Sequence, residues 1–415
     1  MTPASLRLGP FLKSLAVAAA LTVPHVSADV VTHWNKVATD VTLAAAIDPL
    51  AESRILAIVQ IAVHDALNAL DRRYDPYLFR TSVPGTAPEA AVASATREVL
   101  LALLPGQKAA IEAAYTAALA SVTNEAARTS AVSTGRLAAL TILTERANDG
   151  SAIELSPTPG QNPGEWRPTG PDFVPAFRAG WGQVKPFGLR TSSQFRPDRP
   201  FQVGSPEFAT SLQEVKEIGG TVSMSRTEEH STIARYWYES SPQGWNRIAR
   251  NVAEQKNQSV WDNARLFALM NVALADGYIA NFESKYFFYF WRPITAITTG
   301  DSDGNPDTSG DPTWTAYLVT PPVPDYPSGH STVGAAAARA LEHAFSNDFI
   351  PFSMTSGPPY PGITRRFWSF SEAAHENAAS RVLAGIHFWH ASRGGIRQGE
   401  QIADYIHANL FGRAR

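Results

Sequence analysis

The sequence predicts an all-α protein. Apolar residues recur at helical spacing over residues 53–70, over 89–148 and, with breaks, from residue 205 onward. No segment alternates apolar and polar residues for long enough to predict a sheet, and the sequence has no solenoid repeat and no low-complexity tail. Its 415 residues, 44% of them hydrophobic, are sufficient to bury a large core. We therefore expect one large helical domain or two fused helical halves.

Residues 1–28 have the pattern of a signal peptide. Arg7 and Lys13 precede an apolar run at residues 15–23, and the small residues at 26–28 suit signal peptidase. The alternatives are a short buried helix or an uncleaved anchor. No later stretch contains the roughly 18 consecutive apolar residues that a membrane-spanning helix needs. We expect an exported protein, periplasmic or extracellular, without a membrane span.

The rest of the chain divides by composition into three parts. Residues 29–150 are helical in pattern, and within them residues 53–70 are apolar on nearly every side, which is typical of a buried helix. Residues 151–205 scatter Pro and Gly among aromatic residues, which excludes long regular elements, whereas helical periodicity returns in residues 206–415. We expect a connecting segment whose aromatic side chains pack on the helical body or roof a pocket, namely Trp166, Phe173, Phe177 and Trp181.

The composition excludes several classes of function. A formal net charge of −3 gives no global basic field, so nucleic acid and anionic membranes are poor candidates for partners. The chain has no cysteine, which excludes thiolate catalysis, cysteine-ligated metals and stabilisation by disulfides. Any site that binds an anion must therefore be local.

The first candidate motif is Lys285, six residues, and then Arg292-Pro293. Seven residues are close to two helical turns, so the two cations are predicted to project from one helix face about 10 Å apart along its axis. Proline is tolerated only in the first turn of a helix, which places Arg292 at a helix end. The alternative is that both side chains only extend their charged ends to solvent from an aromatic helix.

The second motif, Pro327-Ser328-Gly329-His330, opens an alanine-rich helix. Ser328 is placed to cap that helix, and Gly329 lets the backbone approach a ligand where the first free N–H groups point. His330 beside this helix start can transfer protons near neutral pH. The alternative is an ordinary helix cap with an incidental histidine.

The third motif is Ser380-Arg381, five residues, and then His387. An arginine within an apolar run needs a partner, because an unpaired buried charge is costly. On a straight helix the two side chains would point about 120° apart with roughly 9 Å of rise, so they would not share a face. Either the arginine side chain wraps toward the site, or the helix yields near Gly385.

Together the three motifs supply the donors that a tetrahedral or trigonal-bipyramidal oxyanion needs. Three cations, a hydroxyl group, a helix N-terminus and two histidines are expected to line one cavity, because charge-assisted donors bind such oxygens best. The residues are Lys285, Arg292, Ser328, Gly329, His330, Arg381 and His387.

Two cation sites are competing hypotheses. His375, His387 and His390 could ligate zinc, although no helix carries the His-Glu-x-x-His pattern. Residues 300–307 place oxygen side chains at alternate positions, as calcium-binding loops do, but the later Gly and terminal Glu of an EF-hand are missing. An Asx-rich turn is the favoured interpretation of residues 300–307.

The order of the three motifs resembles the signature of the superfamily that joins type 2 phosphatidic acid phosphatases, bacterial acid phosphatases and vanadium-dependent haloperoxidases. Residues 29–40, 53–77 and 290–332 also look like the exported bacterial branch labelled vanadium-dependent haloperoxidase. The resemblance implies a helical bundle of the acid phosphatase and vanadium haloperoxidase type. It also implies vanadate as the cofactor of a peroxidase, and no cofactor in a phosphatase.

Carried over by motif, the resemblance implies a role for each site residue. His387 would be the axial ligand to vanadium, or the nucleophile toward phosphorus, and His330 would be the acid/base at the opposite apical oxygen. The remaining residues would neutralise the oxyanion or donate hydrogen bonds to it, namely Lys285, Arg292, Arg381, Ser328 and the N–H of Gly329.

The sequence leaves three functions open. A peroxidase would use hydrogen peroxide and a halide, with or without an organic substrate, whereas a soluble acid phosphatase would hydrolyse phosphate esters through a phosphohistidine. The third possible function is a non-catalytic protein that binds phosphate or vanadate. Such a protein would not need two histidines that face each other across the anion. The sequence leaves the oligomeric state open, a homodimer included.

Two positions depart from the family pattern. Many members have an acidic residue four positions beyond the ligand histidine, where this chain has Ala391, so that support for the histidine is absent or comes from elsewhere. Fungal chloroperoxidase has Phe near the halide, five residues before the serine, where this chain has Val323. The resemblance therefore does not assign halide specificity.

Overall fold

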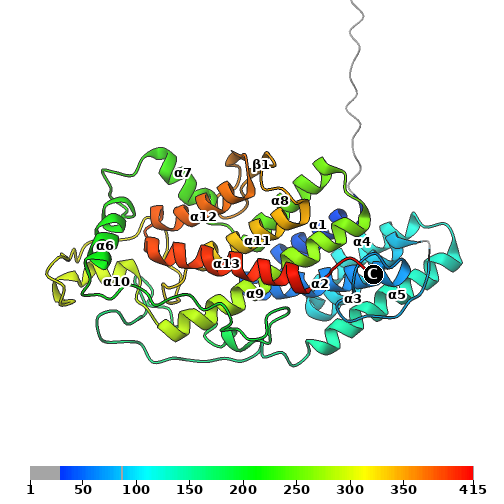
Figure 1. The fold of residues 1–415 in the computed structure, drawn as a ribbon, viewed down its shortest axis with the longest axis horizontal. Coiled ribbons are helices and arrows are strands. Elements are labelled where there is room, and N and C mark those ends of the chain that lie inside the picture. The colour runs from blue at the N-terminus through cyan, green and yellow to red at the C-terminus, as the bar shows by residue number, and fades with distance from the viewer. Residues whose placement is uncertain (1–28, 86, 415) are drawn as a thin grey trace, which may run out of the picture.

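The computed structural model describes residues 29–85 and 87–414, which form an elongated helical molecule (Figure 1). The predicted fold class, all-α, is confirmed. The signal-peptide prediction for residues 1–28 lies outside the described residues. In the described part the elements are α1 (Val30–Ala44), α2 (Pro49–Leu70), α3 (Pro88–Leu103), α4 (Lys108–Ala120), α5 (Glu125–Glu145), α6 (Pro206–Ile218), α7 (Glu228–Tyr236), α8 (Ser241–Lys256), α9 (Val260–Phe288), α10 (Pro293–Thr298), α11 (Gly329–Phe345), α12 (Phe370–Leu383), α13 (Trp389–Asn409), β1 (Phe352–Thr355) and β2 (Thr364–Phe367).

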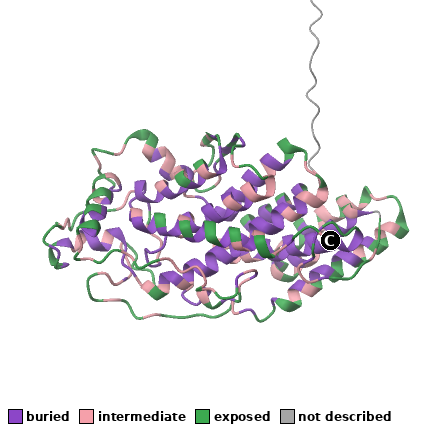
Figure 2. Ribbon diagram, in the orientation of Figure 1, coloured by how far each residue is buried: buried purple, intermediate pink, exposed green. Residues whose placement is uncertain are grey.

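Helix α2 links the N-terminal helices to the rest of the protein. Its N-cap Asp48 accepts hydrogen bonds from the N–H groups of Leu50 and Ala51, and Pro49 occupies the first helical position. α2 packs against α3 and α5 on one side and against α9 on the other. It is buried along almost its whole length (Figure 2), as its apolar pattern predicts.

Three long helices, α9, α11 and α13, pack together in the C-terminal part, and α12 packs on α11 and α13. Two glycines permit the close approach of α13 to α11. A Cβ atom at Gly399 would lie 2.0 Å from the carbonyl oxygen of Thr332, and one at Gly395 would lie 2.7 Å from that of Ser328. The start of α11 is thus held against α13 by backbone contact.

Residues 146–205 connect the two helical parts mostly without regular structure, apart from the short 3₁₀ helix η2 (Trp181–Gln183). The fully buried Asp276 on α9 fastens this segment by accepting hydrogen bonds from three successive N–H groups, those of Phe187, Gly188 and Leu189. Of the predicted packing aromatics, Trp166 and Trp181 are buried. Phe177 is 37% exposed and thus mostly covered, whereas Phe173 is 66% exposed and lines a surface pocket with Ile294 and Trp314, which is the second role predicted for these aromatics.

The structure also corrects the prediction that no strand pairs form. β1 and β2 pair antiparallel, with Phe352 opposite Phe367. Each strand has only four residues, which is too short for an alternating pattern to be distinguished in the sequence.

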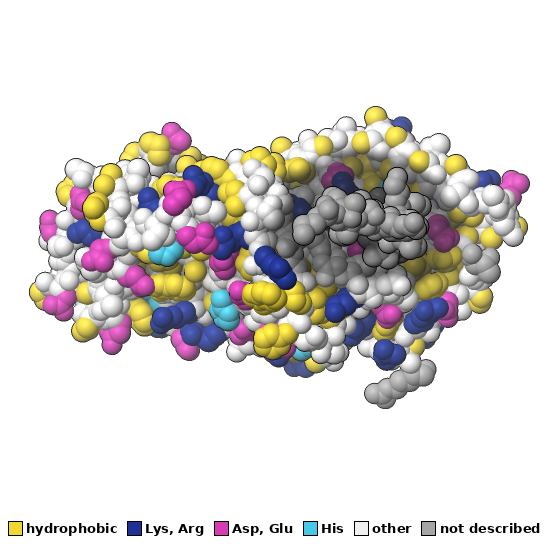
Figure 3. Space-filling model, turned by 90° about the horizontal axis from the view of Figure 1, so that it is seen from above, with side chains coloured by type: hydrophobic (Ala, Val, Ile, Leu, Met, Phe, Trp, Pro, Cys, Tyr) yellow, Lys and Arg dark blue, Asp and Glu magenta, His cyan; other side chains and the backbone are white. Residues whose placement is uncertain are grey.

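Among the described residues, no helix is both long and apolar enough to cross a membrane. On the surface visible in Figure 3, basic and acidic side chains are interspersed.

Candidate active site

The first motif does not lie on one continuous helix. α9 ends at Phe288, where Tyr289 takes the left-handed conformation (φ 52°), and Arg292 lies outside the helix as the N-cap of α10. The predicted shared helix face is therefore wrong. The placement of Arg292 at a helix end is confirmed, because Pro293 begins α10.

Lys285 and Arg292 nevertheless reach the same short segment before α11. The Lys285 Nζ donates to the carbonyl oxygens of Pro324 and Asp325, at 2.6 and 3.0 Å. The Arg292 Nε donates to the carbonyl oxygen of Val323 at 2.7 Å. Both cations are buried. The two cations are thus brought together by their contacts with the segment before α11. Their seven-residue spacing in the sequence is not the cause.

The predicted cap at the start of α11 is confirmed. Ser328 is the N-cap residue, and its side chain accepts from the N–H of Ser331 at 3.5 Å. Gly329 is the first helical residue, so its N–H is among the donors without a partner inside the helix. The Nε2 of His330 lies 3.2 Å from the carbonyl oxygen of Glu239, which can only accept. His330 therefore carries its proton on Nε2, and Nδ1 is free to accept one.

The third motif breaks where the sequence allowed a break. α12 ends at Leu383 and α13 begins at Trp389, so His387 lies in the link between two helices. Gly385 has φ 76°, and a Cβ atom there would lie 2.0 Å from the carbonyl oxygen of Gly219. Arg381 is in the last turn of α12. The alternative in which the helix yields near Gly385 is thus confirmed.

Sequence reasoning missed a buried carboxylate at the centre of this cluster. Asp325 is 0% exposed, and its Oδ1 lies 2.7 Å from Nδ1 of His387 and 3.8 Å from Nη1 of Arg292. A carboxylate therefore stands beside His387 although position 391 is alanine, so the support comes from elsewhere in the chain. The available signal was an acidic residue inside an otherwise apolar, proline-rich stretch directly before the Ser-Gly-His motif.

The electrostatics show that these groups form one cluster. Burial lowers the pKa of His387 and of His330 well below the ordinary value, and three nearby cations lower both further. Burial also lowers the pKa of Lys285 well below its usual range and those of two arginines to about 10. It raises the pKa of Asp325 to about 7 against the opposing effect of Arg292 and Lys285. The three cations are Lys285, Arg292 and Arg381.

The cluster has donors left over for a ligand. Arg381 is 1% exposed, yet its Nε has no hydrogen-bond partner among the described residues, and its Nη1 reaches only the carbonyl oxygen of Trp237 at 3.3 Å. Lys285 has three N–H donors, of which two are used. Orphaned buried donors are costly, so these residues fit a bound oxyanion such as vanadate or phosphate.

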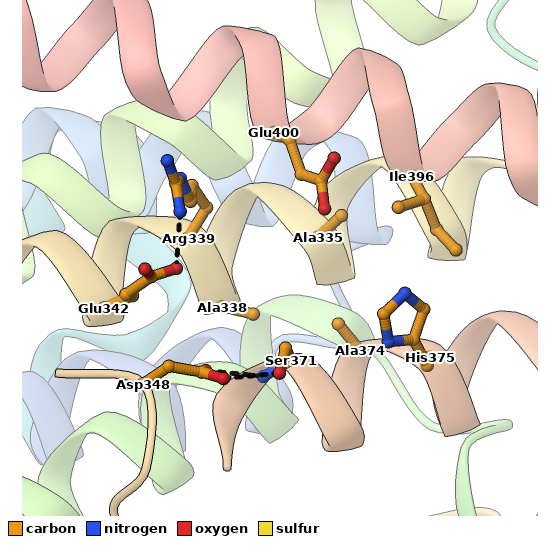
Figure 4. A pocket seen from close by; sticks show the side chains of 10 residues that line it. All are labelled: Ala335, Ala338, Arg339, Glu342, Asp348, Ser371, Ala374, His375, Ile396 and Glu400. Carbon is orange, nitrogen blue, oxygen red and sulfur yellow. Dashed lines mark hydrogen bonds and ion pairs between the residues drawn. The ribbon is translucent and has the colours of Figure 1, made fainter.

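The structure does not bring the three histidines of the zinc hypothesis together. His387 stands beside Asp325, and His390 stacks on Phe388 with ring centroids 5.4 Å apart. His375 instead lines a cavity of about 160 Å³ between α11, α12 and α13 (Figure 4), with Glu400 facing it from α13. Among the described residues, no three His, Cys, Asp or Glu side chains are grouped closely enough to hold a metal ion.

The acidic loop at residues 300–307 forms Asx turns. Asp303 Oδ1 accepts from the N–H of Asn305 at 2.8 Å, and Asn305 Oδ1 accepts from the N–H of Asp307 at 2.9 Å. Thr308 also donates its hydroxyl to Asp303. The oxygen side chains thus bind their own backbone, which is the favoured interpretation of this loop.

His390 gives a prediction about stability and pH. Both of its ring nitrogens are buried without a hydrogen-bond partner among the described residues, and burial lowers its pKa to about 3. Replacement by phenylalanine, which suits neighbours such as Phe290 and Phe388, should raise the free energy of unfolding by about 1–3 kcal/mol.

The gain from His390→Phe should increase as the pH falls. The unfolded histidine takes up a proton below pH about 6.5, whereas the folded one does not until pH about 3, so the wild type loses stability between these values. Urea unfolding of both proteins at pH 8 and at pH 5 measures the difference. An equal difference at the two pH values would show that His390 is not held neutral.

Comparison with known proteins gives relatives of one kind. Residues 265–412, which contain all seven predicted site residues, match the family model described as the VCPO second helical-bundle domain. Vanadium chloroperoxidase from Curvularia inaequalis is 28% identical over 246 residues, which are 44% of this chain and 40% of that protein's length.

Solved structures extend the likeness along the chain. The first bacterial vanadium-dependent iodoperoxidase to be solved has a TM-score of 0.79 and 25% identity, covering 92% of this chain and 96% of that one. A bacterial vanadium-dependent chloroperoxidase in its holo form shares the fold, with a TM-score of 0.70 and 20% identity over 87% of this chain and 92% of that one. The family model covers the helices that carry the site, and the likeness in fold extends along nearly the whole described chain, so this protein is similar to vanadium haloperoxidases in both respects.

Proposed function

We propose that this protein is a vanadate-dependent haloperoxidase, which oxidises a halide with hydrogen peroxide. The observation that carries the proposal is the cluster around His387. Nη1 of Arg292 lies 3.0 Å from Nε2 of this buried histidine, and Lys285 and Arg381 are near enough to lower its pKa and that of His330 further. Nε of Arg381 has no hydrogen-bond partner among the described residues. An oxyanion that also accepts a bond from a ring nitrogen uses all of these groups. Its relatives include a chloroperoxidase and an iodoperoxidase.

In this proposal the residues of the chain bind and neutralise the oxyanion. When bound, vanadate supplies a Lewis acid that activates hydrogen peroxide toward a halide. Lys285, Arg292 and Arg381 would neutralise the charge of the bound oxyanion, and the hydroxyl of Ser328 and the N–H of Gly329 would donate further hydrogen bonds. His387 would supply a neutral ring nitrogen as the direct protein ligand to vanadium.

His330 is proposed to hold and move a proton at one of its ring nitrogens. Its Nε2–H is engaged by the carbonyl oxygen of Glu239, which leaves Nδ1 as the acceptor. Because its pKa lies well below the ordinary value, His330 is neutral at physiological pH and ready to accept a proton. His330 would take up and release this proton at Nδ1. Val323 occupies the position at which fungal chloroperoxidase has a phenylalanine near the halide. Its carbonyl oxygen accepts a hydrogen bond from Nε of Arg292.

A soluble acid phosphatase is the second candidate, because one observation favours it as well. Asp325 beside His387 is the arrangement that a histidine nucleophile needs, with a carboxylate orienting the ring. The same cations would stabilise a phosphoryl transfer transition state, and His330 would protonate the leaving alcohol. A non-catalytic anion binder would use the cations but would have no use for two neutral histidines.

One preparation distinguishes these functions. Purified protein is freed of bound anions, divided, and loaded with vanadate or left without it. Halogenation of a dye with chloride, bromide or iodide and hydrogen peroxide is compared with hydrolysis of p-nitrophenyl phosphate. Peroxidase activity that depends on vanadate supports the proposal. Ester hydrolysis that vanadate inhibits, without halide oxidation, would identify a phosphatase, and activity in neither assay would leave only an anion binder.

Phosphate is expected to compete with vanadate. Both are oxyanions of similar geometry, and the same three cations would bind either of them. Titration calorimetry should give an apparent dissociation constant for vanadate that increases in proportion to phosphate concentration, and phosphate buffer should suppress halide oxidation to the same extent. Equal vanadate affinity with and without millimolar phosphate would exclude a shared site.

We also propose that the protein is exported. The pattern of residues 1–28 supports this, and Asp29 is already the N-cap of α1, so cleavage after residue 28 would leave that helix intact. Expression of the full chain in its own host, followed by N-terminal sequencing, tests the proposal. A mature protein that retains Met1 inside the cell would contradict it.

A further inference from the structure

Asp325 is a buried acidic group in the candidate site, and the fold holds it there firmly. Its N–H donates to the carbonyl oxygen of Phe290 at 2.8 Å. Its own carbonyl oxygen accepts from Lys285 Nζ. The side chain is 0% exposed, and its Oδ1 lies near both Nη1 of Arg292 and Nδ1 of His387. A buried carboxylate among the donors of an anion site repels the ligand, so its presence there needs a reason.

The contacts of His387 determine which ring nitrogen carries the proton. Nη1 of Arg292 lies 3.0 Å from Nε2 and 3.4 Å from Nδ1 of His387, distances so similar that the guanidinium lies over the ring face and favours neither nitrogen. A carboxylate accepts hydrogen bonds, and Oδ1 of Asp325 lies 2.7 Å from Nδ1. The contact with Asp325 therefore places the hydrogen on Nδ1 and leaves the lone pair on Nε2.

The contact between Asp325 and His387 is close but not linear. Neither carboxylate oxygen of Asp325 has an aligned donor among the described residues, although the atoms are within hydrogen-bonding distance. The short distance between Oδ1 of Asp325 and Nδ1 of His387 therefore supports the assignment.

We propose that Asp325 is the positioning residue of this site, which holds His387 in the Nδ1–H form and presents the Nε2 lone pair to the oxyanion. This inference rests on the proposed function, in which Nε2 binds vanadium. A carboxylate hydrogen-bonded to a ligating histidine orients the ring and strengthens the other nitrogen as a donor. In this chain Asp325 thus orients the ligand histidine, which Ala391 cannot do because its side chain has no hydrogen-bond donor or acceptor.

The proposal separates two effects of opposite sign. The negative charge of Asp325 weakens the binding of every anion, whereas its orientation of His387 strengthens only ligands that take a bond from Nε2. Vanadate can take such a bond, and sulfate, of the same tetrahedral shape, cannot. Comparison of the two anions therefore distinguishes positioning from a general contribution to the fold.

The experiment measures both anions by calorimetry on the full protein and on Asp325→Asn, which keeps the size of the side chain and removes its charge. Vanadate affinity should fall about 10–100-fold, the usual effect of losing such a partner, while sulfate affinity should stay the same or increase. Asp276→Asn is the matched control, because Asp276 is an equally buried carboxylate that binds the connecting segment. It should change neither affinity. Equal losses for vanadate and sulfate, or no loss for vanadate, would overturn the proposal.

A second measurement needs no variant that might misfold. Nitrogen-15 NMR of the histidine rings in the ligand-free wild type, with His387 assigned by its absence in His387→Gln, reports the protonated nitrogen directly. Hydrogen on Nδ1 supports the proposal, and hydrogen on Nε2 overturns it. If the wild type binds vanadate no more tightly than sulfate, the proposed function fails, while the NMR result still decides the role of Asp325.

Discussion

His387→Ala is expected to remove most of the vanadate affinity together with all halide oxidation, whereas His330→Ala is expected to keep binding and lose most of the turnover. In the proposed site His387 supplies the only direct bond from the protein to vanadium, so its loss leaves hydrogen bonds and charge alone. His330 acts through proton transfer, which typically contributes 10²–10⁴ in rate. The turnover of His330→Ala should therefore fall by about that factor, with vanadate affinity only modestly weaker.

Calorimetry for vanadate and steady-state halogenation measure the two properties separately, once circular dichroism has shown that each variant is folded. His375→Ala is the control, because His375 lines the separate cavity between α11, α12 and α13. It should bind and turn over like the wild type. Loss of binding in His330→Ala with retention in His387→Ala would reverse the assignment of ligand and acid/base.

Arg292→Leu is expected to lower the free energy of unfolding by about 3–5 kcal/mol, as the removal of one member of a buried ion pair usually does. Arg292 is 1% exposed, and it donates to two carbonyl oxygens, those of Val323 and Ile386. Leucine would leave both buried carbonyls without this donor and Asp325 without the arginine 3.8 Å from it.

Urea unfolding of the ligand-free protein measures this loss. Arg366→Leu is the control, since Arg366 is an exposed arginine of β2 whose replacement should change stability by less than about 1 kcal/mol. Saturating vanadate should stabilise the wild type more than Arg292→Leu, because a ligand stabilises the state that binds it. A loss in Arg292→Leu no larger than that in Arg366→Leu would show that the buried cation is not held by its partners.

Most of the fold and the chemical character of the site followed from local patterns. Helical periodicity predicted the all-α class, and the capping residue Ser328 predicted the start of α11. The residue types of three motifs predicted an oxyanion site, because cations, a helix N-terminus and histidines are the donors that such ligands need. All of these properties are encoded within a few residues, where sequence spacing and bonding geometry are directly related.

What only the tertiary structure decided depends on contacts between distant segments. The spacing of Lys285 and Arg292 predicted one helix face, yet α9 ends between them and the carbonyl groups at residues 323–325 hold both. The sequence leaves open whether the helix breaks near Gly385 or the side chain of Arg381 wraps toward the site. The backbone of Gly219 decides this, because it excludes a side chain at position 385.

Asp325 shows the same limit most clearly. It is 62 residues from His387 in the chain, and no local pattern relates the two, yet packing brings their side chains within 2.7 Å. A sequence by itself determines which groups are available and which local conformations they prefer. Packing decides which buried charge contacts which ring nitrogen. An unpaired buried charge is costly, and only the complete fold places partners close enough to offset that cost.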